Sequence, residues 1–281
     1  EEKNIGKIVA QLLEKSYSVI VCNDGSSDST GIIAEKMGAI IVNHKRNFGY
    51  GAAIGSLFKK AKECEFDILV TFDSDGQHRI SDIEKVIDPI KNNLADIVIG
   101  SRFLGDEKTE MPKYRKIGVK VITNLVNSQT GKKITDSQSG FRAYSKKIFS
   151  EINLSESGMG ISTEIFIKAN KKKIKITEIP IKILYNGETS KHNPVSHGTS
   201  VMLSTMKFIS IEHPLKFYGI PGVLFLITGL FFILWTIQEF TSSGRIITNV
   251  SLIGIGATIF GMMLMMTSIM LFSLVSVVRE R

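Results

Sequence analysis

The sequence has only two cysteines among its 281 residues, and they stand far apart in the chain. Cys22 and Cys64 have no metal-ligand spacing, and both lie in apolar or helical surroundings. This scarcity excludes a disulfide-rich scaffold, and we expect two buried structural thiols instead.

Charge is almost absent from the last part of the chain. From residue 219 onward the charged residues are only Glu239, Arg245, Arg279, Glu280 and Arg281. Two uncharged segments, 219–237 and 250–278, reach about the 20 residues that a helix needs to cross a bilayer, and the second is long enough to tilt. We therefore predict a transmembrane hairpin over 219–281, because a buried hairpin of a soluble protein is disfavoured at this length.

Positive charge flanks the two predicted spans. Lys207 and Lys216 precede the first span, and Arg279 and Arg281 follow the second. Because cytoplasmic flanks carry an excess of lysine and arginine, we expect both chain ends, and the domain before the hairpin, in the cytoplasm. The segment 201–211 is amphipathic and is expected to lie along the membrane surface.

The hairpin also carries signals of close packing. Trp235 lies near the end of the first span, as an aromatic anchor at a membrane interface would. Gly254, Gly256 and Gly261 would let helices approach closely, within one chain or between chains. Since a two-span hairpin often packs against partners, a homo-oligomer is one expected arrangement.

The net charge of +8 belongs mostly to the residues before the hairpin. A basic balance suits nucleic acid, an anionic membrane or a phosphorylated substrate equally well. The basic residues are spread along the chain and no nucleic-acid recognition module is present, so nucleic acid is the weakest of these partners. The apolar tail favours membrane lipids.

Apolar strands alternate with amphipathic helices before the hairpin. Strands are expected at 18–22, 39–42, 68–72 and 96–99, with a strand pair around Pro180 at 175–183. Helices are expected at 4–15, 28–37, 47–62, 81–92, 113–130 and 164–172. This order predicts an α/β domain over 1–195, with a mostly parallel sheet covered by helices on both faces. Residues 196–218 would join it to the hairpin.

Two carboxylates follow the buried strand 68–72 at the point where it ends. The sequence there is Thr71-Phe72-Asp73-Ser74-Asp75-Gly76-Gln77-His78. Ligands gather at the carboxyl ends of the strands in such a sheet. Paired carboxylates there can hold a hard divalent cation and leave positions for phosphate oxygens and water. A surface turn is the alternative, because aspartate, serine and glycine also favour turns.

Four stretches carry a family resemblance in their order and spacing, although each is weak alone. They are Asn23-Asp24-Gly25-Ser26-Ser27-Asp28, Asp73-Ser74-Asp75-Gly76-Gln77-His78, Gly100-Ser101-Arg102 and Asp136-Ser137-Gln138-Ser139-Gly140-Phe141-Arg142. Together they resemble family 2 glycosyltransferases of the GT-A fold, and most closely the dolichyl- or polyprenyl-phosphate hexose synthases. The resemblance covers the whole part before the hairpin. It implies a GT-A fold, a GDP- or UDP-sugar donor, and Mg²⁺ or Mn²⁺ as cofactor.

The beginning of the chain departs from the family pattern. The family usually opens with a strand that ends in a P-x-Y-N-E-E-like motif against the nucleotide base. Here only Glu1 and Glu2 match the end of that motif. We therefore expect that a first strand is missing ahead of Glu1, together with part of the base pocket.

The resemblance assigns the donor side of the site. Asp24 would face the nucleotide base or ribose, although a turn aspartate explains D-G-S equally well. Asp73, Asp75 and Gln77 would bind the metal and the nucleotide-sugar, with Asp75 as the principal ligand and a catalytic residue. The cation would stabilise the charge of the leaving nucleoside diphosphate. His78 would touch the substrate or serve as a structural histidine.

Three cations are expected around the acceptor. A lipid monophosphate suits a bidentate guanidinium or clustered ammonium groups. We assign this role to Arg102, Arg115 and Lys191, of which Arg102 and Lys191 are also expected to be catalytic. Arg115 and Lys191 have the alternative of being solvated charges. Asp136 and Gln138 are expected to line the sugar pocket, or to order their loop by local hydrogen bonds.

The residues around Glu164 bear on the chemistry of the acceptor. A hydroxyl acceptor needs a carboxylate to take its proton. Relatives that act on sugar hydroxyls tend to carry an acidic pair before this helix, whereas this chain has Glu164 alone. It also lacks the Q-x-x-R-W motif of processive polysaccharide synthases, since its one tryptophan is Trp235. A phosphate is already ionised, so we expect direct displacement, with inversion, onto a dolichyl or polyprenyl phosphate.

Two other functions stay open on the sequence. A family 2 transferase could act on a sugar or glycan hydroxyl instead of a lipid phosphate. A membrane-anchored sugar-nucleotide sensor or assembly scaffold would need no chemistry, but the intact Asp73, Asp75 and Gln77 argue against it. The nucleotide base, the sugar and the lipid length are not specified by any of these motifs.

Overall fold

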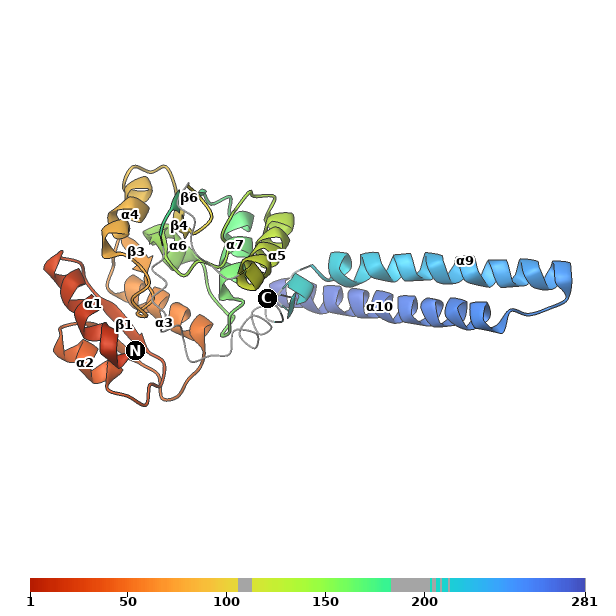
Figure 1. Ribbon diagram of the computed structural model, residues 1–281, viewed down its shortest axis with the longest axis horizontal. Helices are drawn as coiled ribbons and strands as arrows, with labels where there is room; N and C mark the ends of the chain where they lie inside the picture. Colours follow the sequence, from red (N-terminus) through yellow and green to blue (C-terminus); the bar gives the residue numbers. More distant parts are fainter. Residues whose placement is uncertain (106–112, 183–202, 204–205, 208, 212, 281) are drawn as a thin grey trace. The chain divides into compact units, whose positions relative to one another are not determined.

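The structure is a computed structural model that describes residues 1–105, 113–182, 203, 206–207, 209–211 and 213–280 (Figure 1). Two compact units divide the chain, Glu1–Thr205 and Met206–Arg281, and each is described by itself. The first holds all the described strands, and the second holds the two long apolar helices.

The strands of the first unit form two hydrogen-bonded groups. Strands β1 (Ile20–Asn23) and β2 (Ile40–Asn43) pair in parallel. The second group has the order β3-β5-β4-β6, from β3 (Ile68–Thr71), β4 (Ile97–Ser101), β5 (Arg142–Ser145) and β6 (Ile176–Pro180). The pairing of β4 with β6 is parallel, whereas β5 runs antiparallel to both β3 and β4.

The second group is mostly parallel, as predicted, since β3, β4 and β6 run in one direction and β5 alone is reversed among its described strands. No strand was expected at Ala143 and Tyr144, because this stretch lacks a long apolar run. Both side chains are nevertheless buried, one on each face of the sheet. Likewise, the strand pair expected at 175–183 is one described strand, β6, because Pro180 ends it.

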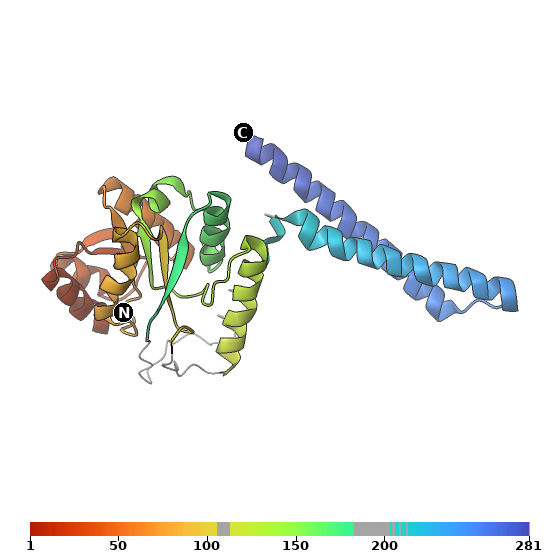
Figure 2. The same cartoon turned by 90° about the horizontal axis from the view of Figure 1, so that it is seen from above.

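Helices cover both faces of the sheet, as predicted (Figure 2). Their bounds are α1 (Glu2–Glu14), α2 (Thr30–Lys36), α3 (Tyr50–Glu63), α4 (Ile83–Lys91), α5 (Lys113–Thr130), α6 (Lys146–Glu151) and α7 (Ile161–Lys171), with a short 3₁₀ helix at Ile80–Asp82. Alternate residues of a strand point to opposite faces. Ile97 and Ile99 therefore pack with α3, α5, α6 and α7, while Val98 packs with α1 and α4.

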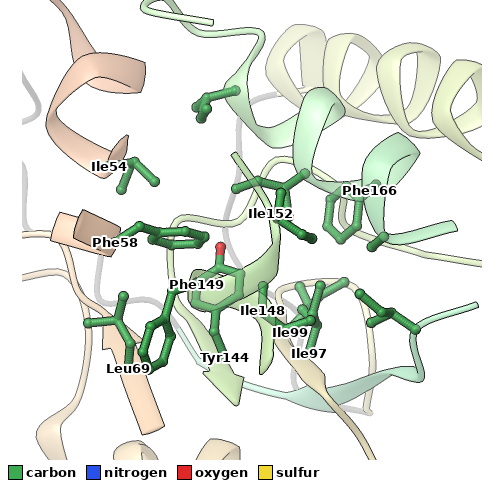
Figure 3. Close-up of a cluster of buried hydrophobic side chains, with 14 of the residues drawn as sticks. Ile54, Phe58, Leu69, Ile97, Ile99, Tyr144, Ile148, Phe149, Ile152 and Phe166 are labelled. Carbon is green, nitrogen blue, oxygen red and sulfur yellow. The ribbon is translucent and has the colours of Figure 1, made fainter. Parts of the chain in front are cut away.

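The core on the first of these faces is the larger one (Figure 3). Phe58 of α3 meets the rings of Tyr144 and Phe149 edge-on, with centroids 4.9 and 6.4 Å apart. Phe166 of α7 is fully buried in the same cluster. This core fixes β3, β4 and β5 together, and thereby fixes the loops at the ends of those strands.

A cavity of about 590 Å³ lies between β1 and β3. Each of these strands pairs with a single described strand, β2 for β1 and β5 for β3. Apolar side chains of α1, among them Ile8 and Val9, line the cavity together with Val21 and Val70 of the strands. The strand expected ahead of Glu1 stays a prediction.

The second unit is a helical hairpin. A π-helical turn at Leu215–Gly219 leads into α9 (Ile220–Ser243), and α10 (Thr248–Glu280) follows after a short connection. Both helices are long and apolar enough to cross a membrane, and most of their large apolar side chains are exposed. The two segments agree with the spans predicted from the sequence.

Small residues set the contact between α9 and α10. A Cβ atom built on Gly229 would lie 2.7 Å from the backbone nitrogen of Thr258, and one built on Gly261 would lie 2.8 Å from that of Leu226. Gly254 is buried in the same contact, whereas Gly256 faces open space. The predicted close packing within the chain is therefore confirmed for Gly254 and Gly261, and Gly256 does not take part in it.

We expect Gly229→Val to destabilise the hairpin by about 1–3 kcal/mol, because the added methyl groups overpack a backbone contact. Gly256→Val makes the same change at an open position and should stay within about 0.5 kcal/mol of wild type. Trp235 is the one tryptophan and lies in α9, so its emission during unfolding in detergent reports on the hairpin. Equal unfolding of both variants would contradict this account of the packing.

Candidate active site

The acidic motif forms a tight turn directly after β3. Asp75 Oδ1 accepts a hydrogen bond from the backbone N–H of Gln77 at 2.9 Å, and Gly76 takes a φ of 77° that favours glycine. The Asp75 residue is exposed, and the Asp73 side chain is 41% exposed. The backbone carbonyl of Asp75 also accepts from Asn4 Nδ2 at 3.3 Å, which ties the turn to α1.

His78 ends this turn and points back to its beginning. Its Nε2 lies 3.2 Å from Asp73 Oδ2, and its ring stacks on Phe141 with centroids 5.1 Å apart. Phe72 meets the same ring at 5.5 Å. Only 4% of the His78 side chain is exposed. The structure thus favours the structural alternative for His78 over direct contact with substrate.

The turn offers a donor set that suits Mg²⁺ or Mn²⁺. Asp73 and Asp75 supply carboxylate oxygens and Gln77 supplies an amide oxygen, which are the hard ligands that these cations prefer. Gly140 leaves room for the Asp73 carboxylate, because a Cβ on Gly140 would lie 2.6 Å from Asp73 Oδ2. In the described part of the chain, no three His, Cys, Asp or Glu residues form a metal cluster. Substrate oxygens and water would therefore have to complete the coordination.

Asp24 lies at the carboxyl end of β1, on the lining of the cavity. Its Oδ1 accepts from His44 Nδ1 at 2.6 Å and from the Phe48 backbone at 2.8 Å, and its Oδ2 accepts from the Gly49 backbone at 2.8 Å. Burial would raise the pKa of Asp24, but the hydrogen bonds from Phe48, His44 and Gly49 hold that pKa below its ordinary value. Asp24 therefore anchors the loop 44–49. Its nucleotide-binding role stays a prediction.

Two residues of this region were missed by sequence reasoning. His44 Nε2 lies 2.8 Å from Ser56 Oγ, so the imidazole links Asp24 to α3. Tyr50 lines the cavity. The pKa of its phenol is raised, mainly because the group is buried and secondly because the Asp73 carboxylate is near. Neither residue belongs to a recognisable motif, and only the fold brings them to the site.

Arg102 and Asp136 bind each other, although we expected them in separate pockets. Arg102 Nε donates to Asp136 Oδ2 at 2.6 Å, Arg102 Nη2 donates to Oδ1 at 2.8 Å, and the Arg102 backbone N–H donates to Oδ2 at 3.1 Å. Asp136 is fully buried and Arg102 is 9% exposed. The pair fixes the end of β4 against the loop before β5. An acceptor role for Arg102, or a sugar-pocket role for Asp136, stays a prediction.

The loop after Asp136 is ordered largely by its own contacts. Gln138 Nε2 donates to Ser137, which agrees with the local-ordering alternative for this residue. Arg142 is buried, donates through Nη2 to the Ser137 carbonyl and Ser162 Oγ, and lies 4.7 Å above the Phe166 ring. Two expected acceptor cations have no described side chain: Arg115 lies on α5 with only its backbone described, and Lys191 lies outside the described residues.

Glu164 is fully buried near the beginning of α7. Its carboxylate accepts from the Ser155 and Glu156 backbone N–H groups and from Ser155 Oγ, and it forms an ion pair with Lys168 at 2.7 Å. Burial would raise the pKa of Glu164, but the bonds from Lys168, Ser155 and Glu156 hold it below the ordinary value. The carboxylate is thus fixed to the 155–156 loop in its ionised form.

The fold itself is shared with solved glycosyltransferase structures. Glucosyl-3-phosphoglycerate synthase from Mycobacterium tuberculosis, solved with Mn²⁺, UDP and phosphoglyceric acid, matches with a TM-score of 0.56 at 17% identity, over 74% of each chain. Mannosyl-3-phosphoglycerate synthase from Rubrobacter xylanophilus matches with a TM-score of 0.58 at 15% identity, over 76% of this chain and 72% of that one. The first unit therefore has the predicted GT-A fold.

The sequence gives the family directly. Residues 1–152 match the family described as glycosyl transferase family 2. The chain belongs to this family and is a glycosyltransferase, as the motifs predicted.

Several relatives of the chain carry names of glycosyltransferases. The UDP-N-acetylglucosamine–dolichyl-phosphate N-acetylglucosaminyltransferase of Methanococcus voltae is 36% identical, over 72% of this chain and 87% of the relative. Glycosyltransferase AglJ of Haloferax volcanii is 27% identical over 100% of this chain and 92% of its own length. The dolichol-phosphate mannosyltransferase of Pyrococcus furiosus is 31% identical, over 64% of this chain and 51% of that protein.

Proposed function

We propose that this glycosyltransferase moves a hexose or N-acetylhexosamine from a UDP- or GDP-sugar to a dolichyl or polyprenyl phosphate at the membrane. The family and the names of the relatives support the class of reaction. The observation that carries the acceptor assignment is the state of Glu164. Its oxygens are already engaged by Ser155, Glu156 and Lys168, so it is not placed to take a proton from a hydroxyl acceptor.

The donor would bind at the carboxyl ends of β1 and β3. Asp73, Asp75 and Gln77 would hold a divalent cation there, and the cation would stabilise the charge on the leaving diphosphate. Asp24 and Tyr50 line the cavity that opens beside these residues and would face the nucleoside. An acceptor phosphate oxygen, already ionised, would attack the anomeric carbon in line with the leaving group and invert it.

The acceptor side would lie at the membrane surface, with the first unit in the cytoplasm. The cytoplasmic side is inferred from the lysines and arginines that flank the apolar helices, and helix α5 supports contact with a membrane surface. Its outer face exposes Ile117 at 63% and Val121 at 49%, and the neighbouring Lys116 and Lys120 are also exposed. An exposed face that combines apolar side chains with lysines suits the head-group region of anionic lipids. The two apolar helices of the same chain would keep the lipid phosphate at high effective concentration.

The test is a transfer assay on the purified full chain in detergent, with Mg²⁺ or Mn²⁺. Radiolabelled UDP- and GDP-sugars would be offered with dolichyl phosphate, undecaprenyl phosphate or a free glycan. We expect label in a lipid product that mild acid releases as free sugar, since glycosyl phosphates are acid-labile. A product stable to mild acid would favour a hydroxyl acceptor. No labelled lipid with any donor would overturn the proposal.

A further inference from the structure

We propose that His78 is a positioning residue that holds the Asp73 carboxylate in the orientation a divalent cation requires. This inference rests on the proposed function, because it concerns the metal site of the same reaction. The sequence was compatible with two roles for His78, contact with the substrate or a structural role. The inference is based on the hydrogen bond between the buried imidazole of His78 and the half-exposed carboxylate of Asp73.

The contacts of His78 fix which nitrogen carries the proton. A carboxylate only accepts hydrogen bonds, so the 3.2 Å contact requires a proton on Nε2. The other nitrogen, Nδ1, is buried and has no partner among the described residues. The hydrogen bond to Asp73 Oδ2 is therefore the one directed polar contact described for this ring. The bond is charge-assisted through its carboxylate acceptor, which strengthens it relative to a bond between neutral groups.

The ring is held on its faces by apolar neighbours. Phe141 stacks on it at an interplanar angle of 26°, and Phe72 packs against it at 60°. Phe72 and Phe141 also touch each other, with centroids 5.7 Å apart. Because Phe72 and Phe141 hold the imidazole in place, it cannot reorient toward the carboxylate. The hydrogen bond therefore forms only when the carboxylate of Asp73 adopts the matching orientation. The direction of Asp73 is thus set from the interior of the protein.

Because Gly140 has no side chain, the Asp73 carboxylate can lie directly beside its backbone. A Cβ atom on Gly140 would lie 2.6 Å from Asp73 Oδ2 and 3.0 Å from Oδ1. The Gly140 carbonyl accepts from Thr71 Oγ1 at 2.6 Å, which holds this backbone against the end of β3. The hydrogen bond from His78 thus orients a carboxylate for which Gly140 leaves room. Outer-shell partners of this kind orient metal ligands, and their loss commonly costs 10–100-fold in metal affinity.

Two substitutions separate the hydrogen bond from the packing. His78→Phe keeps an aromatic ring between Phe72 and Phe141 but removes the donor, whereas His78→Gln keeps an N–H donor near the position of Nε2. The full-length variants would be titrated with Mn²⁺ in the presence of UDP or GDP, and free Mn²⁺ would be followed by electron paramagnetic resonance. We expect the Kd for Mn²⁺ to rise about 10–100-fold in His78→Phe and to stay within about threefold of wild type in His78→Gln.

The outcomes separate this inference from the proposed function. If the wild-type protein binds no Mn²⁺ with either nucleotide, the metal assignment and the inference both fail. If it binds Mn²⁺ and His78→Phe binds it equally well, with an unchanged melting temperature in metal-free buffer, only the positioning role fails. Equal weakening in both variants would point to packing alone and would also overturn it. Should His78→Phe not fold, His78→Met gives the same test, because methionine also fills space between Phe72 and Phe141 and lacks a hydrogen-bond donor.

Discussion

Asp75→Asn should lower the rate of sugar transfer by about 100- to 1,000-fold, since a metal-bound leaving group gains several kcal/mol of charge stabilisation. The substitution keeps the Oδ1 atom that accepts from the Gln77 backbone, so the turn after β3 should persist. It removes the negative charge that would bind Mg²⁺ or Mn²⁺. Because Asp75 is exposed, the melting temperature should change little. The measurement is kcat with the donor and lipid phosphate that the transfer assay identifies.

Asp88→Asn is the matched control for this prediction. It makes the same chemical change at an exposed position of α4, away from the acidic turn, and should leave the rate within about twofold of wild type. Removal of metal with EDTA should reduce the wild-type rate to the level of Asp75→Asn. If Asp75→Asn keeps full activity and that activity still depends on metal, Asp75 is not a metal ligand.

The parts of the fold that follow from repeated patterns could be predicted. Apolar runs such as 68–71 and 97–99 alternate with helical spacing, and this is enough for a sheet with helices on both faces. The antiparallel strand β5 could not be predicted in this way. Its four residues include Arg142 and Ser145, and Arg142 is buried only because its charge meets the Ser137 carbonyl, Ser162 and the Phe166 ring. Such compensation depends on neighbours distant in sequence.

The candidate site likewise has a part that the sequence predicts and a part that depends on contacts between residues distant in sequence. The acidic turn is contiguous, so its position after β3 was visible in the sequence. The partners of Asp24 and Asp136 were not, because His44 and Arg102 lie 20 and 34 residues away. A motif indicates which carboxylates matter, but it does not show whether each faces a ligand or another part of the protein. For Asp136 the structure gives a protein partner, and this leads to a second prediction of large effect.

Asp136→Ala should destabilise the first unit by about 3–5 kcal/mol, because it leaves the Arg102 guanidinium buried without its carboxylate. The change also removes the acceptor for the Arg102 backbone N–H. In a unit of this size, that loss corresponds to a fall in melting temperature of roughly 6–20 °C. The measurement is thermal unfolding of the full chain in detergent, followed by far-UV circular dichroism, with Asp88→Ala as the exposed control.

A double substitution tests whether the loss comes from the unpaired charge. Replacing the pair by Arg102→Met and Asp136→Leu removes both charges together, and apolar side chains of similar size often match or exceed the stability of a buried ion pair. We expect this protein to regain most of the melting temperature that Asp136→Ala loses. It should still transfer sugar poorly if Arg102 also binds the acceptor phosphate, and normally if the pair is only structural. If Asp136→Ala has the same melting temperature as the wild type, water must reach the Arg102 guanidinium. A guanidinium that water can reach is also accessible to an acceptor phosphate.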